Sequence, residues 1–332
     1  MIKADKKSVC CIAKTIRSCI VAIIDVFTGC ENLLDNLVLK IVVWIVAAGS
    51  FLFNIIAFLY RIFRLKQISS QNFLLINLAA SDILLSLYLI MLSIVNVVYQ
   101  GIFIAISYDW RQSATCIIMA ILSSVSSNMS IYILATLAFL RAMNVLFHYK
   151  VKELHTVIVT TFGWLANLLL SLLTVYRHFY LEGNMISNDA CILYSPGPGN
   201  FQRWIWTFSF FILPNLLLII VISSLYGSII KYTFQSWKKM EKLKAVTTKR
   251  SRTTTLISVG MLTCTNVLTW IPILILSLLS ISGVPTPATI SRYLLCWYLL
   301  HWMLKFSFTR LLWTSYCISF IANIPTCLFN SL

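Results

Sequence analysis

Two charged side chains interrupt long apolar stretches of this chain. Asp82 lies inside the stretch 71–98, and Arg141 lies towards the end of the stretch 112–147. A buried carboxylate must pair or take up a proton, and an ionisable group inside a membrane span is a functional candidate by default. Arg141 also has a simpler interpretation, in which its long side chain reaches the membrane interface. We expect a paired carboxylate at Asp82 and favour a functional role for Arg141.

Residues suited to enzymatic or metal chemistry are not grouped in this sequence. The four histidines are scattered, and no set of cysteines and histidines has the spacing of metal ligands. No nucleophile, base and oxyanion donors come together along the chain. We therefore expect neither an enzyme nor a metal or cofactor site.

The elements that must hold Asp82 and Arg141 are membrane-spanning helices. Of 332 residues, 59% are hydrophobic and 11% are charged, and the mean hydropathy is +0.87. This composition excludes a soluble globular domain. A helical span needs about 20 apolar residues, and lipid requires every backbone polar group to be paired internally. Seven stretches meet these requirements, at 39–63, 71–98, 112–147, 155–176, 203–232, 250–280 and 288–318.

These stretches predict an all-α membrane protein, with a seven-transmembrane helix bundle over residues 39–318. A leading segment, 1–38, and a short cytoplasmic tail, 319–332, flank the bundle. The third, fifth and sixth helices should extend past the membrane into water. No internal repeat divides the sequence, so we expect a single membrane domain.

Basic residues gather in alternate links, which predicts the orientation. Three links hold most of them: Arg61, Arg64, Lys66, Lys150, Lys152, Lys231, Lys238, Lys239, Lys242, Lys244, Lys249, Arg250 and Arg252. The positive-inside rule makes these links cytoplasmic and places the N-terminus outside. Anchoring to the anionic lipid of the inner leaflet then explains the net charge of +16 without a nucleic-acid partner. A second interpretation of the link 231–254 is a docking face for a cytoplasmic partner.

The cysteines sort by side of the membrane. Four lie in the outer leading segment, where oxidation is permitted and three pairings are open: Cys10, Cys11, Cys19 and Cys30. Cys116 at the start of the third stretch and Cys191 in the second outer link should also face the oxidising side. A bond between these two would tie the outer link over the mouth of the bundle.

An ordered set of motifs resembles rhodopsin-like G-protein-coupled receptors. Arg141 lies 25 residues after Cys116, the spacing that this class has from its outer disulfide to its inner arginine. The other positions that carry the resemblance are Asn54, Asn77 to Asp82, Trp110, Trp164, Tyr226, and Trp270 with Pro272. The resemblance implies a Cys116–Cys191 disulfide, a location in the plasma membrane as a multi-pass protein, and a heterotrimeric G protein as partner.

The sixth stretch carries a tryptophan and a proline two residues apart. Separately, Trp270 could fill the core and Pro272 could be tolerated in a span. Together they favour a helix that is kinked and pivots at its inner half.

The leading segment resembles the hinge of relaxin-type receptors, which joins leucine-rich repeats to the bundle. The resemblance rests on Cys10 to Cys19, on Glu31 to Leu34, and on the segments 225–228 and 270–273. It implies an extracellular peptide or protein ligand, relayed by the hinge and the outer links. A disulfide between Cys10 and Cys19 is one of the pairings that stay open for this hinge-like segment. The chain starts about where the repeats would end.

The resemblance also assigns an inner activation switch. It implies that Arg141 moves towards Tyr226 and the G protein, with basic residues lining the opening: Lys249, Arg250 and Arg252. The acid that usually precedes this arginine is replaced by Leu140, so we expect a weakly latched receptor with raised basal signalling.

The family's sodium site would contain Asp82 and Ser130. Here Lys305 falls where another polar ligand is usual, so we expect its ammonium to pair with Asp82 and to replace the ion. The segment 309–313 also departs from the family's Asn-Pro-x-x-Tyr motif. The alternative function is therefore a divergent, non-signalling receptor that acts as a decoy or as a homo- or heterodimer partner. A transporter or channel lacks support, because no inverted repeats or paired intramembrane acids are present.

Overall fold

The computed structural model describes residues 2–4, 19–21, 32–34, 37–64, 69–177, 188–193 and 205–242. Trp270, Pro272, Lys305 and the three basic residues at 249–252 lie outside these ranges, as do the two predicted spans after residue 242. The elements are β1 (Ile2–Ala4), β2 (Cys19–Val21), α2 (Leu37–Arg64), α3 (Ser70–Val98), α4 (Phe103–Gln112), α5 (Ala114–Leu146), α6 (Glu153–Tyr176), η2 (Phe208–Ile212) and α8 (Leu213–Lys242).

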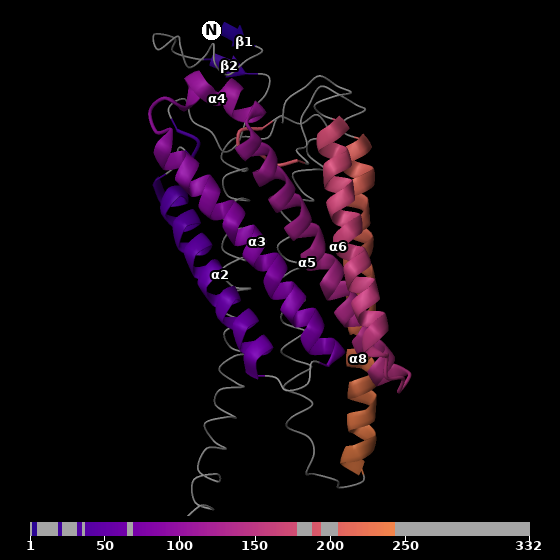
Figure 1. Cartoon of the computed structure of the whole chain (residues 1–332). Helices are drawn as coiled ribbons and strands as arrows, with labels where there is room; N and C mark the ends of the chain where they lie inside the picture. Colours follow the sequence, from indigo (N-terminus) through magenta and orange to yellow (C-terminus); the bar gives the residue numbers. More distant parts are fainter. Residues whose placement is uncertain are drawn as a thin grey trace, which may run out of the picture.

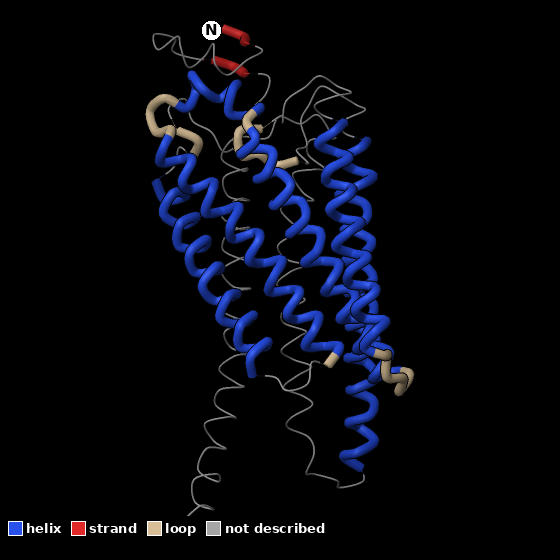
Figure 2. The backbone as a smooth tube through the Cα atoms, in the orientation of Figure 1, coloured by secondary structure: helices blue, strands red, loops and turns tan. Residues whose placement is uncertain are grey.

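Five of these segments have the length and apolarity of membrane spans, and they coincide with the first five predicted stretches. They are Leu37–Phe63, Ser70–Val98, Ala114–Leu146, Glu153–Tyr176 and Ile205–Ser236. Figure 1 shows them running side by side, with α8 extending past the inner ends of α2, α3 and α5. The membrane part of the described chain is helical throughout (Figure 2). The prediction of an all-α membrane bundle is confirmed.

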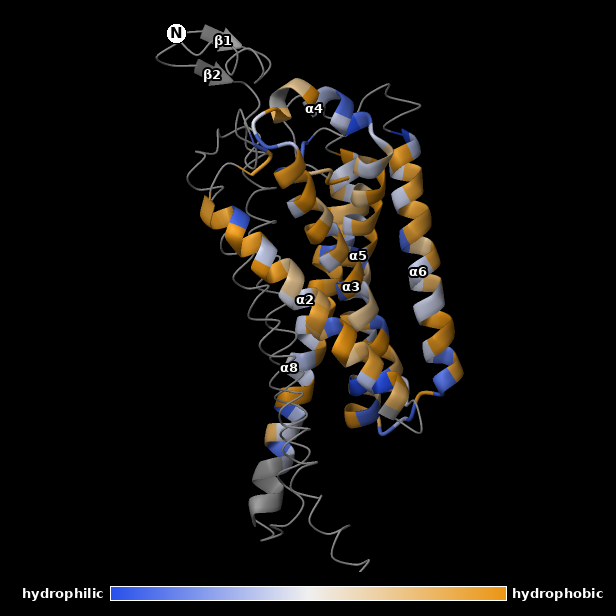
Figure 3. Cartoon of the chain, turned by 60° about the vertical axis from the view of Figure 1, so that its left-hand side comes forward, coloured by the Kyte–Doolittle hydropathy of each residue, from blue (hydrophilic) through white to orange (hydrophobic). Residues whose placement is uncertain are grey.

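Helix α5 lies at the centre of the described bundle. It packs against α3, α6 and α8, while α2 packs on α3. Outward side chains on the peripheral helices are apolar and exposed, as at Phe162 and Leu165, with exposed fractions of 67% and 63%. Hydrophobic residues dominate these helices, and hydrophilic residues lie mainly at their ends (Figure 3). An apolar exterior is what a helix facing lipid requires.

Serine caps set where two of the long helices begin. The Ser69 hydroxyl accepts a bond from the Asn72 amide at 3.4 Å, and the Ser113 hydroxyl accepts one from the Cys116 amide at 3.1 Å. Such side chains satisfy amides that have no partner within the helix. The third span therefore begins at Ala114, two residues later than predicted.

The first outer link contains a helix that the sequence analysis did not predict. Helix α4 buries Phe103, Ser107 and Trp110, which recur at the helical spacing of four and then three residues. Its exposed face carries Tyr108, which is 56% exposed. The short parallel pair of β1 with β2 was also not predicted, and it lies beyond the same end of the bundle as α4 (Figure 1).

Candidate functional site

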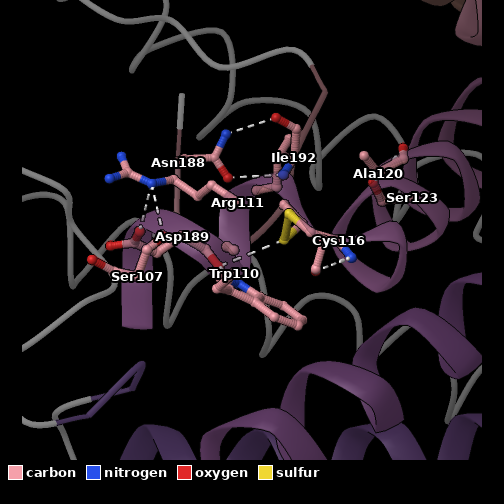
Figure 4. The surroundings of a disulfide bond; sticks show 12 residues. Ser107, Trp110, Arg111, Cys116, Ala120, Ser123, Asn188, Asp189 and Ile192 are labelled. Carbon is pink, nitrogen blue, oxygen red and sulfur yellow. Dashed lines mark hydrogen bonds and ion pairs between the residues drawn. A yellow bond between two sulfur atoms is a disulfide. The ribbon is translucent and has the colours of Figure 1, made fainter. Parts of the chain in front are cut away.

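The outer end of the bundle is closed by a disulfide between α5 and the second outer link. The Cys116 and Cys191 sulfurs are 1.99 Å apart, and their Cα atoms are 5.3 Å apart. Both residues are fully buried. Figure 4 shows this bond beside Trp110 and the segment 188–192. The outer link is thus covalently attached to the central helix by the disulfide that the resemblance implied.

Polar contacts from α4 hold the same link on its other side. The Trp110 indole donates to the carbonyl of Asp189 at 2.9 Å. The Arg111 guanidinium lies 3.5 Å from the Asp189 carboxylate and donates to the carbonyl of Ser107 at 3.1 Å (Figure 4). On the bundle side, the Tyr88 hydroxyl of α3 donates to the carbonyl of Ala190 at 2.9 Å. We call residues 188–193 the outer lid.

The outer lid also folds on itself. The side-chain amide nitrogen of Asn188 donates to the backbone carbonyl of Ile192 at 2.6 Å. The side-chain oxygen of Asn188 accepts from the backbone amide of Ile192 at 2.8 Å. Cys191 adopts a φ of 55°, a conformation that costs energy for a non-glycine residue. The disulfide and the two Asn188 bonds hold the backbone in that conformation, so the lid is a rigid element on the mouth of the bundle.

Two leucines of the leading segment insert into the outer end of the bundle. Leu33 and Leu34 are 1% and 2% exposed, and the Leu34 amide donates to the Asn96 side chain of α3 at 2.8 Å. The sequence analysis assigned these residues to a hinge but did not predict this contact. The signal was the apolar pair between the polar residues 31–32 and 35–36, since exposed leucines there would be costly.

Halfway through the membrane, hydroxyl groups surround Asp82. The Ser130 hydroxyl of α5 donates to the Asp82 carboxylate at 3.0 Å and lies 3.0 Å from the Ser81 hydroxyl. Asp82 is only 4% exposed. The structure thus brings together the two predicted ion-site residues, Asp82 and Ser130. The described residues hold no group of three or more potential metal-ligating His, Cys, Asp or Glu side chains.

Asn54 belongs to the same polar layer through α2. Its amide donates to the carbonyl of Ser50 at 3.0 Å and to the Ser50 hydroxyl at 3.3 Å. Ser50 in turn lies 3.1 Å from the Ser86 hydroxyl of α3. The Ser86 hydroxyl donates to the backbone carbonyl of Asp82 at 2.5 Å, so hydrogen bonds lead from Asn54 to Asp82. Hydrogen bonds between helices hold the bundle together in lipid.

The segment 124–130 of α5 makes polar contacts with three neighbouring helices. Ser124 lies 2.9 Å from Ser171 of α6, and Asn128 accepts from Asn215 of α8 at 3.0 Å. Ser130 reaches α3, as described above. We call residues 124–130 the polar hub. Of the polar hub, the sequence analysis named only Ser130, as a sodium-site residue beside Asp82, and it did not predict the contacts of Ser124 and Asn128.

The predicted tryptophan of the fourth span contacts the second span. The Trp164 indole donates to the Asn77 side chain at 3.0 Å. Both residues carried the resemblance described above, and the structure brings them together across 87 positions of sequence. Helix α6 is thereby fixed against α3 as well as α5.

The predicted switch residues lie at the inner half of the bundle. Arg141 on α5 and Tyr226 on α8 are 5% and 7% exposed, and their helices pack against each other. A guanidinium that reached the interface would be exposed, so the simpler interpretation of Arg141 does not describe this structure. The neighbouring Leu140 and Ala142 are buried as well.

Comparisons with known proteins agree with this architecture. The model of the 7 transmembrane receptor (rhodopsin family) matches residues 53–321. The G-protein coupled receptor GRL101 of Lymnaea stagnalis is 27% identical over 287 residues, covering 85% of this chain and 25% of that protein. Relaxin receptor 1 of Rattus norvegicus is 24% identical over 279 residues, covering 81% and 36%. The follicle-stimulating hormone receptor of Cairina moschata is 24% identical over 156 residues, covering 46% and 22%. The chain thus spans about a third or less of the length of these relatives.

Proposed function

The chain belongs to the rhodopsin family of seven-transmembrane receptors, and from this membership we propose that it passes an extracellular signal to a heterotrimeric G protein. It is a multi-pass plasma-membrane protein and not an enzyme. The single observation that carries the proposal is that α5 holds both the cysteine bonded to the outer lid and the buried arginine. Cys116 joins it to the outer lid, and Arg141 is buried at its inner half.

Helix α5 is suited to carry a movement across the membrane. Between Cys116 and Arg141 it rises about 38 Å, at about 1.5 Å per residue. The polar hub lies between these two positions and is bonded to three neighbours. A displacement of the lid therefore acts on α3, α6 and α8 through one helix, and a packed bundle responds by moving between discrete arrangements.

We propose an extracellular peptide or protein as the ligand. Two of the relatives are named as hormone receptors, a relaxin receptor and a follicle-stimulating hormone receptor. In this chain, Leu33 and Leu34 rest in the outer mouth, and the lid lies on the same side. A ligand that displaces the hinge or the lid would change contacts to both α3 and α5, which is the differential interaction that a population shift requires.

On the inner side, Arg141 and Tyr226 would meet the G protein, with Lys249, Arg250 and Arg252 lining the opening. The residue before Arg141 is Leu140, and an acid there would otherwise hold the arginine while the receptor is inactive. Leu140 cannot supply such an ion pair, so the inactive arrangement is favoured by less free energy over the active one. The ligand-free receptor should therefore signal.

The test is a chimaera in which this chain follows a relaxin-type ectodomain. Ligand-free second-messenger output is compared with that of Arg141→Ala at equal surface expression, and G-protein recruitment is measured with relaxin. Higher output from the unsubstituted chain supports the proposal. Equal basal outputs, together with no recruitment by relaxin, would reject it.

Residues 309–313 depart from the family's Asn-Pro-x-x-Tyr motif, and this departure favours one alternative function. In that alternative the receptor reaches the membrane and pairs with another receptor without activating a G protein. Co-expression distinguishes it from the signalling receptor. A decoy or dimer partner would lower the response of a co-expressed relaxin-type receptor while giving none of its own.

A further inference from the structure

The backbone of the fifth span is irregular just before its proline. In the π-turn η2, the Leu213 amide bonds to the carbonyl of Phe208, five residues back. Pro214 follows and has no amide hydrogen to donate. The regular bonding pattern of the helix is therefore interrupted at two consecutive positions. Single π-turns inside α-helices often lie at functional sites, because one extra residue is accommodated there and can be removed by rewinding.

The side chain of Asn215 bridges this irregularity to α5. Its amide nitrogen donates to the carbonyl of Phe211 at 2.7 Å and to the side-chain oxygen of Asn128 in the polar hub at 3.0 Å. Asn215 is 3% exposed and Asn128 is 7% exposed. One amide nitrogen has two hydrogens, so a single group holds the π-turn and the neighbouring helix at the same time.

The outer end of the π-turn is attached to the flank of the second outer link. The Trp206 indole donates to the Thr174 hydroxyl of α6 at 3.2 Å, and the Arg177 guanidinium lies 4.5 Å from the centre of the Trp206 ring. Phe210, within the π-turn, stacks on Trp206 with ring centres 4.2 Å apart. Arg177 and Trp206 flank the link that contains the outer lid. These contacts join the π-turn to the outer end of α6, where the second outer link begins.

We propose that Asn128 and Asn215 form an amide lock, and that opening this lock transmits movement of the outer link to α8. In the closed state the lock keeps the π-turn wound and α8 against α5. When the outer link shifts Trp206 and Phe210, the turn rewinds, the Asn215 amide leaves Asn128, and the inner half of α8 is released. The two asparagines are positioning residues. The signalling consequence rests on the proposed function, whereas the lock is a property of the bundle.

The primary experiment measures the position of α8 without a G protein. Spin labels are attached through noncanonical amino acids at Leu154 on α6 and Ile230 on α8, which are 66% and 63% exposed, and the distance distribution is recorded in nanodiscs. Asn215→Leu and Asn128→Leu should each raise the ratio of displaced to undisplaced α8 about three- to twentyfold, the range measured for single hydrogen bonds between membrane helices. The double variant should move it no further, because both substitutions remove the same bond.

A second variant guards against simple misfolding. Asn215→Ser keeps a hydroxyl that can bond to the carbonyl four residues back, as Ser93 does to Leu89 at 2.9 Å in this chain, but it is too short to reach Asn128. It should therefore fold and still show the displaced distance. A distribution like that of the unsubstituted protein would overturn the lock.

Asn167→Leu is the matched control. The Asn167 amide also donates to the carbonyl four residues back, that of Gly163, at 2.9 Å, and to the Met129 sulfur of α5 at 3.3 Å, but it lies on α6 away from the π-turn. If loss of any side-chain amide that joins two helices displaced α8, this variant would do the same, and the lock would be refuted. An unchanged distribution supports the lock.

Signalling is measured in parallel on the chimaera with a relaxin-type ectodomain. A rise in the ratio of basal to stimulated output in the two leucine variants supports coupling of the lock to the receptor's output. If the unsubstituted chimaera gives no G-protein response while the variants still displace α8, the proposed function fails and the lock stands. If the chimaera signals and neither distances nor ratio change in the variants, the lock fails and the proposed function stands.

Discussion

Substitution of Gly163 by alanine changes the contact between α5 and α6 at its tightest point. A Cβ added there would lie 2.7 Å from Cδ1 and 3.0 Å from Cζ of Tyr132, and closer still to Cε1. The Tyr132 ring cannot move away freely, because its hydroxyl donates to the carbonyl of Val159 on α6 at 3.0 Å. The added methyl group must therefore separate the helices or break that bond.

The expected cost follows from these two routes. Overpacking of a well-packed contact costs about 1–3 kcal/mol, and loss of the tyrosine hydrogen bond costs about 1 kcal/mol. Alanine recovers up to about 1 kcal/mol as the better helix former. Either route, less that gain, leaves a net cost, so Gly163→Ala should lower the free energy of unfolding by up to about 3 kcal/mol.

Gly227→Ala is the control, because no heavy atom lies within 4 Å of a Cβ added at that position of α8. It should leave stability unchanged or raise it by up to about 1 kcal/mol. The assay is the fraction of monodisperse protein left after heating in detergent, measured for both variants and for Gly163→Ala combined with Tyr132→Leu, which should restore stability. A Gly163→Ala protein as stable as Gly227→Ala would refute the packing described for α5 and α6.

Three further predictions concern the outer lid and the polar layer. Cys191→Ser should lower surface expression severalfold, because a disulfide closing a 75-residue separation stabilises the fold by about 4 kcal/mol. Non-reducing peptide mapping of the unsubstituted protein should recover the Cys116–Cys191 peptide. Absence of that peptide would contradict the lid. Trp110→Phe keeps an aromatic ring but removes the N–H donor to the Asp189 carbonyl. Amide exchange across 188–193 should then quicken by about fivefold, since the lost bond contributes about 1 kcal/mol. Tyr108→Phe, on the exposed face of α4, should not change the exchange rate. Replacing sodium by choline should leave agonist affinity unchanged, because we propose that Lys305 neutralises Asp82; a clear sodium dependence would show that an ion occupies the site.

Much of the fold follows from local properties of the chain. The bounds of the first five spans were predicted to within a few residues. Helix α8 continues to Lys242, past the predicted limit near residue 232, which agrees with the expectation that the fifth helix extends beyond the membrane. Polar extension of a helix into water leaves no hydrophobic signal, so that end could not be located. Helix α4 and the π-turn were missed for a related reason, since a ten-residue helix and a one-residue irregularity are too short to stand out in a hydropathy pattern.

The candidate site was also predictable from the sequence only in part. Asp82 and Arg141 stood out because charged side chains are unusual inside apolar stretches, and the resemblance to the family implied the Cys116–Cys191 disulfide. The partners of the polar hub were not identified, because serine and asparagine occur in many membrane helices without a specific role. Whether Ser124 meets α6 or Asn128 meets α8 depends on how each helix is rotated about its axis.

What the sequence alone determined is the membrane as solvent and the five spans that the structure describes, since length and apolarity act on each segment separately, while the ordered motifs carried the resemblance to the family. The tertiary structure alone decided which polar groups meet: the Leu34 amide with Asn96, Trp110 with Asp189, and Asn215 with Asn128. Lipid leaves a buried donor no water to bond with, so these pairs form only where the packing of several helices brings both groups within about 3 Å. That requirement is a property of the assembled bundle.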